Sequence, residues 1–274
     1  MKADPQKQIF SQESLWQNAR QKPAELERAM QIRGLIPMGV RWVLDAGCGS
    51  GVVANLLSDY QVIGLDFSHV ALQFVARDRV EGDLNCLPFV GGQFDLVVSS
   101  EVLEHIPYRN YQGVLAEIAR VANAHLIVSV PWRQRMKRSQ VRCPNCACLF
   151  QPHYHMRSFD ERIMADLFKN HGFRLQSLST CGERRENLGL SSLVRWLGLS
   201  KFPPHTVCPQ CGYSAEMNET VPSERREPAQ TFNARQRVRS LVYRLWPRRK
   251  KQPRWWLGLY SRYLPAPAEN PDLA

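Results

Sequence analysis

At residues 45–51 the chain reads Asp-Ala-Gly-Cys-Gly-Ser-Gly, directly after the short apolar run Trp42-Val43-Leu44. Glycines let a backbone turn tightly and approach a ligand closely. The apolar run before them and the apolar positions of residues 51–58 after them predict a strand, a tight turn and a helix. Because a helix start presents unpaired N–H groups, this stretch predicts a ligand-binding turn at the end of a buried strand.

The alternation of strand and helix continues along the chain. Further strands are predicted at residues 61–65, 94–99 and 125–130, and helices between them at 68–77 and 111–121. Such alternation indicates βαβ units and a parallel sheet. We therefore predict an α/β fold with a Rossmann-like, doubly wound, mostly parallel sheet over residues 41–180, preceded by a helical lead-in over 1–40.

The region after residue 132 departs from this pattern. Residues 133–156 form a basic, cysteine-rich insertion. Ser158 with Glu161 forms a capping box that predicts a helix running to about residue 170, with Gly172 as its C-cap. Residues 173–180 then alternate like a strand.

Acidic residues follow several of the predicted strands. Asp66 lies in Gly64-Leu65-Asp66-Phe67-Ser68, at the end of the second predicted strand, where an acid can accept hydrogen bonds from two ribose hydroxyls. Asp83 follows in Gly82-Asp83-Leu84, and Glu101 follows the strand at 94–99. The sequence therefore predicts one site at the carboxyl ends of several strands.

Together these motifs resemble the class I S-adenosylmethionine-dependent methyltransferases of small-molecule type. The resemblance covers about residues 40–131 and rests on residues 45–51, Leu65-Asp66-Phe67-Ser68, Gly82-Asp83-Leu84 with Leu87-Pro88-Phe89, and residues 94–99 with Leu103-Glu104-His105. It implies an enzyme that binds S-adenosyl-L-methionine and transfers its methyl group.

The resemblance also implies roles for individual residues. Asp45, Gly47 and Gly49 would line the methionine part of the cofactor, with Cys48 in the same loop and Glu101 nearby. Asp66 would hold the ribose and Phe67 would lie against the adenine. Asp83 would meet the adenine amino group beside the backbone of Leu84. The resemblance assigns no catalytic residue.

Other interpretations of these residues remain open. A Rossmann dehydrogenase competes as a cofactor class, although Gly47-x-Gly49-x-Gly51 is tighter than the dinucleotide pattern. Asp45 could simply cap a turn, and Asp83 could be a solvated loop acid. Glu104 and His105 could be structural.

Four of the eight cysteines form two CPxC pairs, Cys143 with Cys146 and Cys208 with Cys211. Two residues between thiolates let both sulfurs point at one ion, so the pairs predict a closed, structural four-thiolate Zn²⁺ site. The site would join the insertion at 133–156 to a second half at 181–224. Unrelated surface turns, a redox dithiol and disulfides are the alternatives.

Three residues of the insertion could take other roles. Cys148, His153 and His155 could replace a zinc ligand, or pack and lie in loops. Since imidazole titrates near neutrality, one of the two histidines could instead act as a base at the carboxyl edge of the sheet.

The net charge of +11 resides in residues 225–262, within the basic aromatic C-terminal tail predicted at 225–274. Residues 225–262 hold twelve Lys and Arg against Glu227 alone, and the rest of the chain is neutral. Apolar residues at helical spacing predict a helix over 231–246, and Arg254-Trp255-Trp256 suits an anionic membrane interface. Peripheral membrane contact through 231–262 is expected, with a helix packed on the body or nucleic-acid binding as alternatives.

The acceptor is accordingly expected to be a small molecule, a glycan or a lipid-linked compound, methylated in the cytoplasm or at the inner membrane face. The polar start of the chain shows no signal peptide, and no run approaches the roughly 18 apolar residues of a membrane span. An RNA methyltransferase and a non-catalytic, zinc-stabilised cofactor-binding module are the alternatives.

Overall fold

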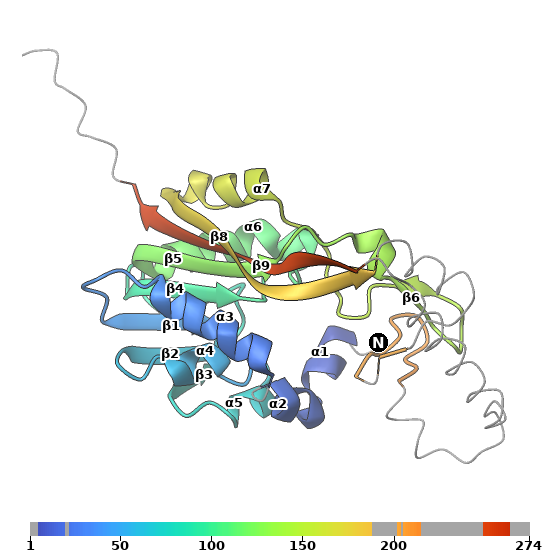
Figure 1. The fold of residues 1–274 in the computed structure, drawn as a ribbon. Coiled ribbons are helices and arrows are strands. Elements are labelled where there is room, and N and C mark those ends of the chain that lie inside the picture. Colours follow the sequence, from blue (N-terminus) through green and yellow to red (C-terminus); the bar gives the residue numbers. More distant parts are fainter. Residues whose placement is uncertain (1–4, 20–21, 188–201, 204, 215–248, 264–274) are drawn as a thin grey trace, which may run out of the picture.

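The central sheet has seven strands in the order β3-β2-β1-β4-β5-β9-β8 (Figure 1). In this computed structural model the described residues are 5–19, 22–187, 202–203, 205–214 and 249–263. The strands are β1 (Trp42–Ala46), β2 (Gln61–Asp66), β3 (Asp78–Glu81), β4 (Phe94–Ser100), β5 (Ala122–Pro131), β8 (Phe173–Asn187) and β9 (Arg249–Arg262). The first five strands of this order, β3, β2, β1, β4 and β5, pair in parallel with their neighbours. Strand β9 pairs antiparallel with both β5 and β8. The predicted Rossmann-like, mostly parallel α/β sheet is confirmed.

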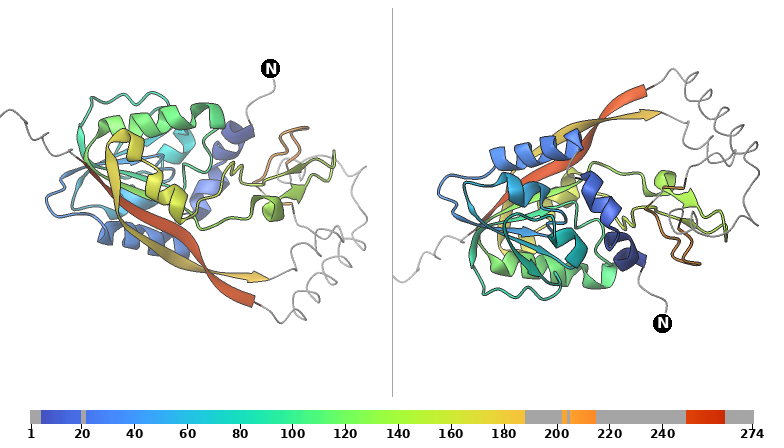
Figure 2. Two further views of the ribbon diagram at one scale, coloured as in Figure 1. Left: turned by 90° about the horizontal axis from the view of Figure 1, so that it is seen from above. Right: turned by 90° about the horizontal axis from the view of Figure 1, so that it is seen from below.

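Two apolar cores cover the two faces of the sheet. The helices on one face are α3 (Pro23–Gly34), α4 (Val52–Leu56) and α5 (His69–Leu72), and those on the other are α6 (Tyr108–Val121) and α7 (Glu161–Asp166). Figure 2 shows α3 and α6 on opposite sides of the strands. Successive side chains of a strand point to opposite faces, so Val43 joins the first core and Leu44 the second.

Three predicted helices and one strand differ in detail. The helix predicted at 68–77 has Ser68 as its N-cap, as expected, but α5 ends at Leu72. The predicted cap Ser158 is wrong: Asp160 caps α7, and its carboxylate accepts from the Ile163 N–H at 2.9 Å. The helix predicted at 51–58 is shortened to α4. Strand β3 was not predicted, because three of its four residues are exposed and the segment has no alternating apolar pattern.

The C-terminal strand β9 corrects the prediction of a basic helical tail. Residues 249–262 form a strand between β5 and β8, and Trp255 and Trp256 are only 2% and 5% exposed. Their indoles enter opposite cores, and Trp256 Nε1 donates to the Phe159 carbonyl at 3.1 Å. Buried tryptophan usually finds such a partner. These rings therefore contribute to the protein core and offer no membrane-facing surface, while the helix predicted at 231–246 lies outside the described residues.

The cysteine-rich segments form a small unit of their own. Strands β6 (Val141–Arg142) and β7 (Leu149–Phe150) pair as a hairpin, and Val207 bridges to Ser214 in the segment 205–214. This unit lies beside the N-terminal helix α1 (Pro5–Phe10), beyond the end of the main sheet (Figure 1). Within the described ranges, no helix is both long and apolar enough to cross a bilayer.

Candidate active site

The glycine turn predicted to bind a ligand lies between β1 and α4. Gly47, Gly49 and Gly51 have φ angles of +80°, +52° and +74°. Residues that carry a Cβ rarely adopt such positive φ angles. A Cβ at Gly49 would come within 2.7 Å of the Trp16 ring. Both the backbone angles and the close packing therefore require glycine at position 49.

Two buried carboxylates support this turn. Asp66 Oδ2 accepts from the Gly49 N–H at 2.9 Å, and its Oδ1 accepts from the Ser68 N–H at 2.8 Å. Asp45 Oδ2 accepts from the Ala54 N–H at 3.0 Å, at the start of α4. Burial raises the pKa of Asp45 to about 7 and raises that of Asp66 above its ordinary value. Asp45 therefore binds the first turn of α4, and both acids also line the cavity beside the glycine turn.

A cavity of about 980 Å³ lies over the turn at the carboxyl ends of β1, β2 and β4. All nine residues predicted to bind the cofactor line it, namely Asp45, Gly47, Cys48, Gly49, Asp66, Phe67, Asp83, Leu84 and Glu101. This is the edge where ligands bind in open α/β sheets. The roles of the nine residues toward a cofactor stay predictions.

The N-terminal helices complete the cavity with residues that carry no motif. Phe10 on α1, Trp16 on α2 (Glu13–Ala19) and Arg28 on α3 all line it. The Phe10 ring lies 5.9 Å from the rings of both Trp16 and Phe67, and its carbonyl accepts from Ser68 Oγ at 2.6 Å. The helical lead-in thus covers the cavity and reduces its access to water.

Glu101 occupies a strained position after β4. Its φ of +58° is unusual for a residue with a side chain and costs on the order of 1–3 kcal/mol. The carboxylate lies 3.6 Å from Arg28 Nη1, and the Arg28 guanidinium also packs against the Trp255 ring. Burial raises its pKa to about 7, against the opposing effect of Arg28. Trp255 is the contact that sequence reasoning missed, because the tail was assigned to a membrane.

A second cavity of about 490 Å³ adjoins the first. The two share Gln6, Pro107 and Arg109 in their walls, and the second is otherwise lined by Phe150, Gln151, Tyr154, His155, Met156 and Pro209. Most of these residues come from the cysteine-rich unit. The insertion therefore lines a space that opens next to the predicted cofactor position.

Between the two cavities the structure gathers Glu104, His105 and His155. Glu104 is fully buried, and burial together with the charge of Glu101 raises its pKa well above the ordinary value. Burial lowers the pKa of His105 to about 3 and also lowers the pKa of His155.

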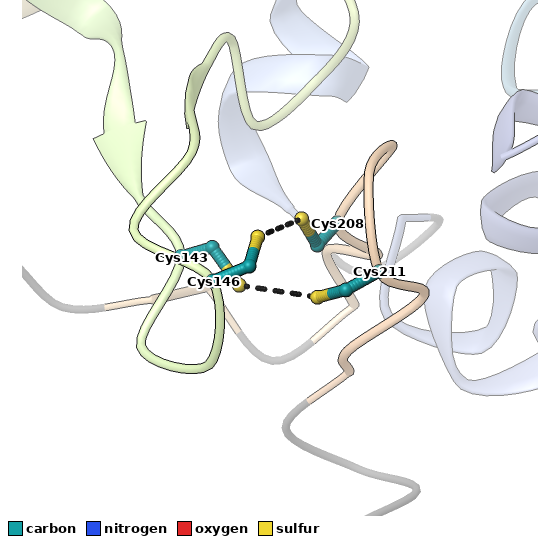
Figure 3. A group of neighbouring side chains, drawn as sticks. All are labelled: Cys143, Cys146, Cys208 and Cys211. Carbon is teal, nitrogen blue, oxygen red and sulfur yellow. Dashed lines mark hydrogen bonds between the residues drawn. The ribbon is translucent and has the colours of Figure 1, made fainter.

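The four predicted zinc ligands converge as expected. Cys143 Sγ lies 3.6 Å from Cys211 Sγ, and Cys146 Sγ lies 3.6 Å from Cys208 Sγ (Figure 3). A tetrahedral ion with Zn–S bonds of about 2.3 Å separates its sulfurs by roughly 3.8 Å, so the donor set fits zinc. All four cysteines are free thiols, which contradicts the disulfide alternative for them. The substitute ligands Cys148, His153 and His155 lie outside this cluster.

Comparison with known proteins assigns the family. The sequence profile of the family described as a methyltransferase domain matches residues 17–178, more than half of the chain. The chain belongs to the class I S-adenosylmethionine-dependent methyltransferases. The match includes the glycine turn, both buried carboxylates and the strand end that carries Glu101.

Individual relatives agree with this assignment. A probable S-adenosylmethionine-dependent methyltransferase of Mycolicibacterium smegmatis is 29% identical over 143 residues, covering 50% of this chain and 53% of that protein. An uncharacterised protein of Methanocaldococcus jannaschii is 41% identical over 81 residues, covering 29% of this chain and 35% of its own length. The chain thus spans about half or less of the length of these curated relatives.

Among solved structures, a SAM-dependent methyltransferase from Archaeoglobus fulgidus superposes with a TM-score of 0.54. It is 14% identical, and the match covers 91% of this chain and 98% of that chain. At this identity the similarity shows a shared fold.

Proposed function

We propose that this protein transfers a methyl group from S-adenosyl-L-methionine to a small-molecule acceptor. The observation that carries the proposal is the placement of all nine motif residues around one cavity of about 980 Å³. Three carboxylates face this space: those of Asp45 and Asp66 are buried, and that of Glu101 is partly buried. A ligand with a positive charge and hydroxyl donors would satisfy them.

In this proposal the residues around the cavity contact different parts of the cofactor. Asp66 accepts the ribose hydroxyls, while the exposed Phe67 ring packs on the adenine beside Asp83. Asp45 and Glu101 attract the positive methionine portion. When bound, the cofactor supplies an electrophilic methyl group on its sulfonium.

Catalysis then depends mainly on placement. Holding two reactants at attack distance supplies much of the rate enhancement without a dedicated catalytic group. The covering helices α1 and α2 exclude water, and Glu101 is held in place by Arg28 and Trp255. The acceptor enters from the second cavity, whose aromatic and apolar side chains favour an acceptor with an apolar body.

A glycan or lipid-linked acceptor at a membrane has less support than the sequence suggested, because Trp255 and Trp256 lie in the core. Methylation of RNA and a purely structural module are the other outcomes that the experiments below separate. The four-cysteine cluster holds Zn²⁺ in this proposal and fixes the wall of the second cavity.

The deciding experiment is calorimetric titration of S-adenosylhomocysteine into the purified protein, with Asp66→Asn and Asp78→Asn as a matched pair. Asp78 is exposed on the edge strand β3 and outside the cavity. Micromolar binding that is lost in Asp66→Asn and kept in Asp78→Asn supports the proposal. Absence of binding in the wild-type protein would leave the non-catalytic module as the better description.

A further inference from the structure

The cluster of Glu104, His105 and His155 has the composition of a metal site separate from the four cysteines. One ligand atom from each residue lies within 4.8 Å of the others. Two imidazoles with one carboxylate form a set that divalent zinc, iron and cobalt bind in proteins. We propose that these three residues bind a divalent cation between the cofactor cavity and the second cavity.

The carboxylate of Glu104 is the strongest argument. Its side chain is fully buried, and within the described part of the chain neither oxygen receives a hydrogen bond from a protein donor. His105 Nε2 lies 4.0 Å from Glu104 Oε1, beyond hydrogen-bond distance, and the neighbouring carboxyl group of Glu101 is itself an acid. An uncompensated buried carboxyl group is costly, and a bound cation would remove that cost.

His155 is oriented as metal-binding histidines usually are. His155 Nδ1 lies 2.5 Å from Gln134 Oε1, so it donates there and leaves the lone pair of Nε2 available. Metal-binding histidines almost always donate their second ring nitrogen to such an oxygen, which fixes the tautomer. His105 Nε2 lies 4.0 Å from Glu104 Oε1, and His105 Nδ1 has no hydrogen-bond partner among the described residues.

Backbone contacts hold the two halves of the cluster together. The Met156 N–H donates to the Glu104 carbonyl at 2.7 Å, and Arg157 Nη1 donates to the Leu103 carbonyl at 2.5 Å. The imidazole centroids of His105 and His155 are 4.6 Å apart. The segment that carries His155 is thereby fixed against the turn that carries Glu104 and His105.

The position of this site suggests its use. His105 lines the cofactor cavity and His155 lines the second cavity. Three protein ligands leave coordination positions for water or for an oxygen of the acceptor. This inference rests on the proposed function. A metal ion at this position would select acceptors that offer an oxygen ligand near the atom to be methylated.

The test is titration of Co²⁺ into full-length protein loaded with one equivalent of zinc, which the four thiolates take first. We expect one equivalent of Co²⁺ to bind with d–d absorption and without a thiolate-to-cobalt charge-transfer band. Glu104→Gln and His155→Gln should each weaken binding at least about tenfold, and Gln134→Leu by about 10- to 100-fold. His171→Ala, outside the cluster on the 3₁₀ turn η2 (Lys169–His171), should bind Co²⁺ like the wild type.

Two results would overturn the site: no Co²⁺ binding by the zinc-loaded wild type, or undiminished binding by both Glu104→Gln and His155→Gln. Because His155 lies in a loop, its variant remains informative even where Glu104→Gln fails to fold. Titration of S-adenosylhomocysteine into the same samples separates the two proposals. Cofactor binding without Co²⁺ binding removes only the metal site, whereas loss of cofactor binding in the wild type removes the proposed function.

Discussion

The Trp255 ring and the Glu101 carboxylate contact the same guanidinium, that of Arg28, which thereby joins the last strand of the sheet to the wall of the cofactor cavity. The Arg28 guanidinium lies 4.6 Å from the Trp255 ring centroid and 3.6 Å from Glu101 Oε2. The cavity wall therefore depends on three parts of the chain that are far apart in sequence.

The neighbouring tryptophans provide a matched test of this contact. Trp255→Phe should weaken binding of S-adenosylhomocysteine by roughly tenfold, because the smaller ring holds the Arg28 guanidinium beside Glu101 less firmly and a desolvated cation–π contact with tryptophan is worth about 2 kcal/mol. Trp256→Phe removes a donor to the Phe159 carbonyl on the opposite face and should lower stability without changing affinity. Calorimetry and urea unfolding measure both quantities. Equal loss of affinity in the two variants would mean that Trp255 acts only through packing.

The turn requires glycine at position 49, so Gly49→Ala should abolish measurable cofactor binding while the protein remains folded. The reasons are the φ of +52° and the 2.7 Å approach of the new Cβ to Trp16. Gly113→Ala is the control, since Gly113 lies within α6 with free space around it and should stabilise the protein by about 0.5–1 kcal/mol. Wild-type affinity in Gly49→Ala would show that the turn does not contact the cofactor.

Asp45 should give the apoprotein an unusual pH dependence. Its folded pKa of about 7 lies above the unfolded value of 3.8, so the folded state favours the protonated form. Its contribution to stability is therefore greatest below pH 3.8 and declines until about pH 7, by up to about 1.4 kcal/mol per pH unit.

The difference in unfolding free energy between wild type and Asp45→Asn, measured by urea at pH 5 to 7.5, should show that decline. Asp95→Asn serves as control, because backbone hydrogen bonds from Trp42 and Arg41 lower the pKa of Asp95 and place its effect below this window. A flat difference for Asp45→Asn would contradict the burial of an acid at this position.

Removal of one cysteine should separate the metal from the cofactor. Cys211→Ser is expected to lower the zinc retained after dialysis and to lower the melting temperature, since the four thiolates hold the two halves of the cysteine-rich unit together. Cofactor affinity should change little, because the four cysteines do not line the larger cavity. Cys86→Ser, exposed and outside the cluster, is the control for both elemental analysis and thermal melting. Unchanged zinc content in Cys211→Ser would contradict the predicted site.

The sequence predicted those parts of the site that are local in the chain. Gly47, Gly49 and Asp66 follow from the geometry of a turn and a strand end, and the CPxC pairs from their two-residue spacing. Trp16 and Arg28 could not be found this way, since they reach the cavity only when the lead-in helices fold over it. The grouping of His155 with Glu104 likewise depends on tertiary contacts.

The tail shows why composition alone misled. The composition of Arg254-Trp255-Trp256 suits both a membrane interface and a buried strand. Which of the two forms depends on whether neighbouring strands pair with this segment. Here Trp256 lies opposite Val130 of β5 and Thr180 of β8. The positive charges of β9 are partly balanced, for example by the 2.9 Å pair of Lys251 with Glu183.

The position of β9 also governs the order in which the protein can be assembled. β9 is the last of the described strands and separates β5 from β8. Within the described residues β8 pairs with β9 alone, so β8 cannot join the sheet until residues 249–262 have been synthesised. Pairings between distant segments form slowly. Since Trp255 also completes the surroundings of Glu101, a nascent chain interrupted before this strand would carry every motif of the family and still lack a finished cofactor site.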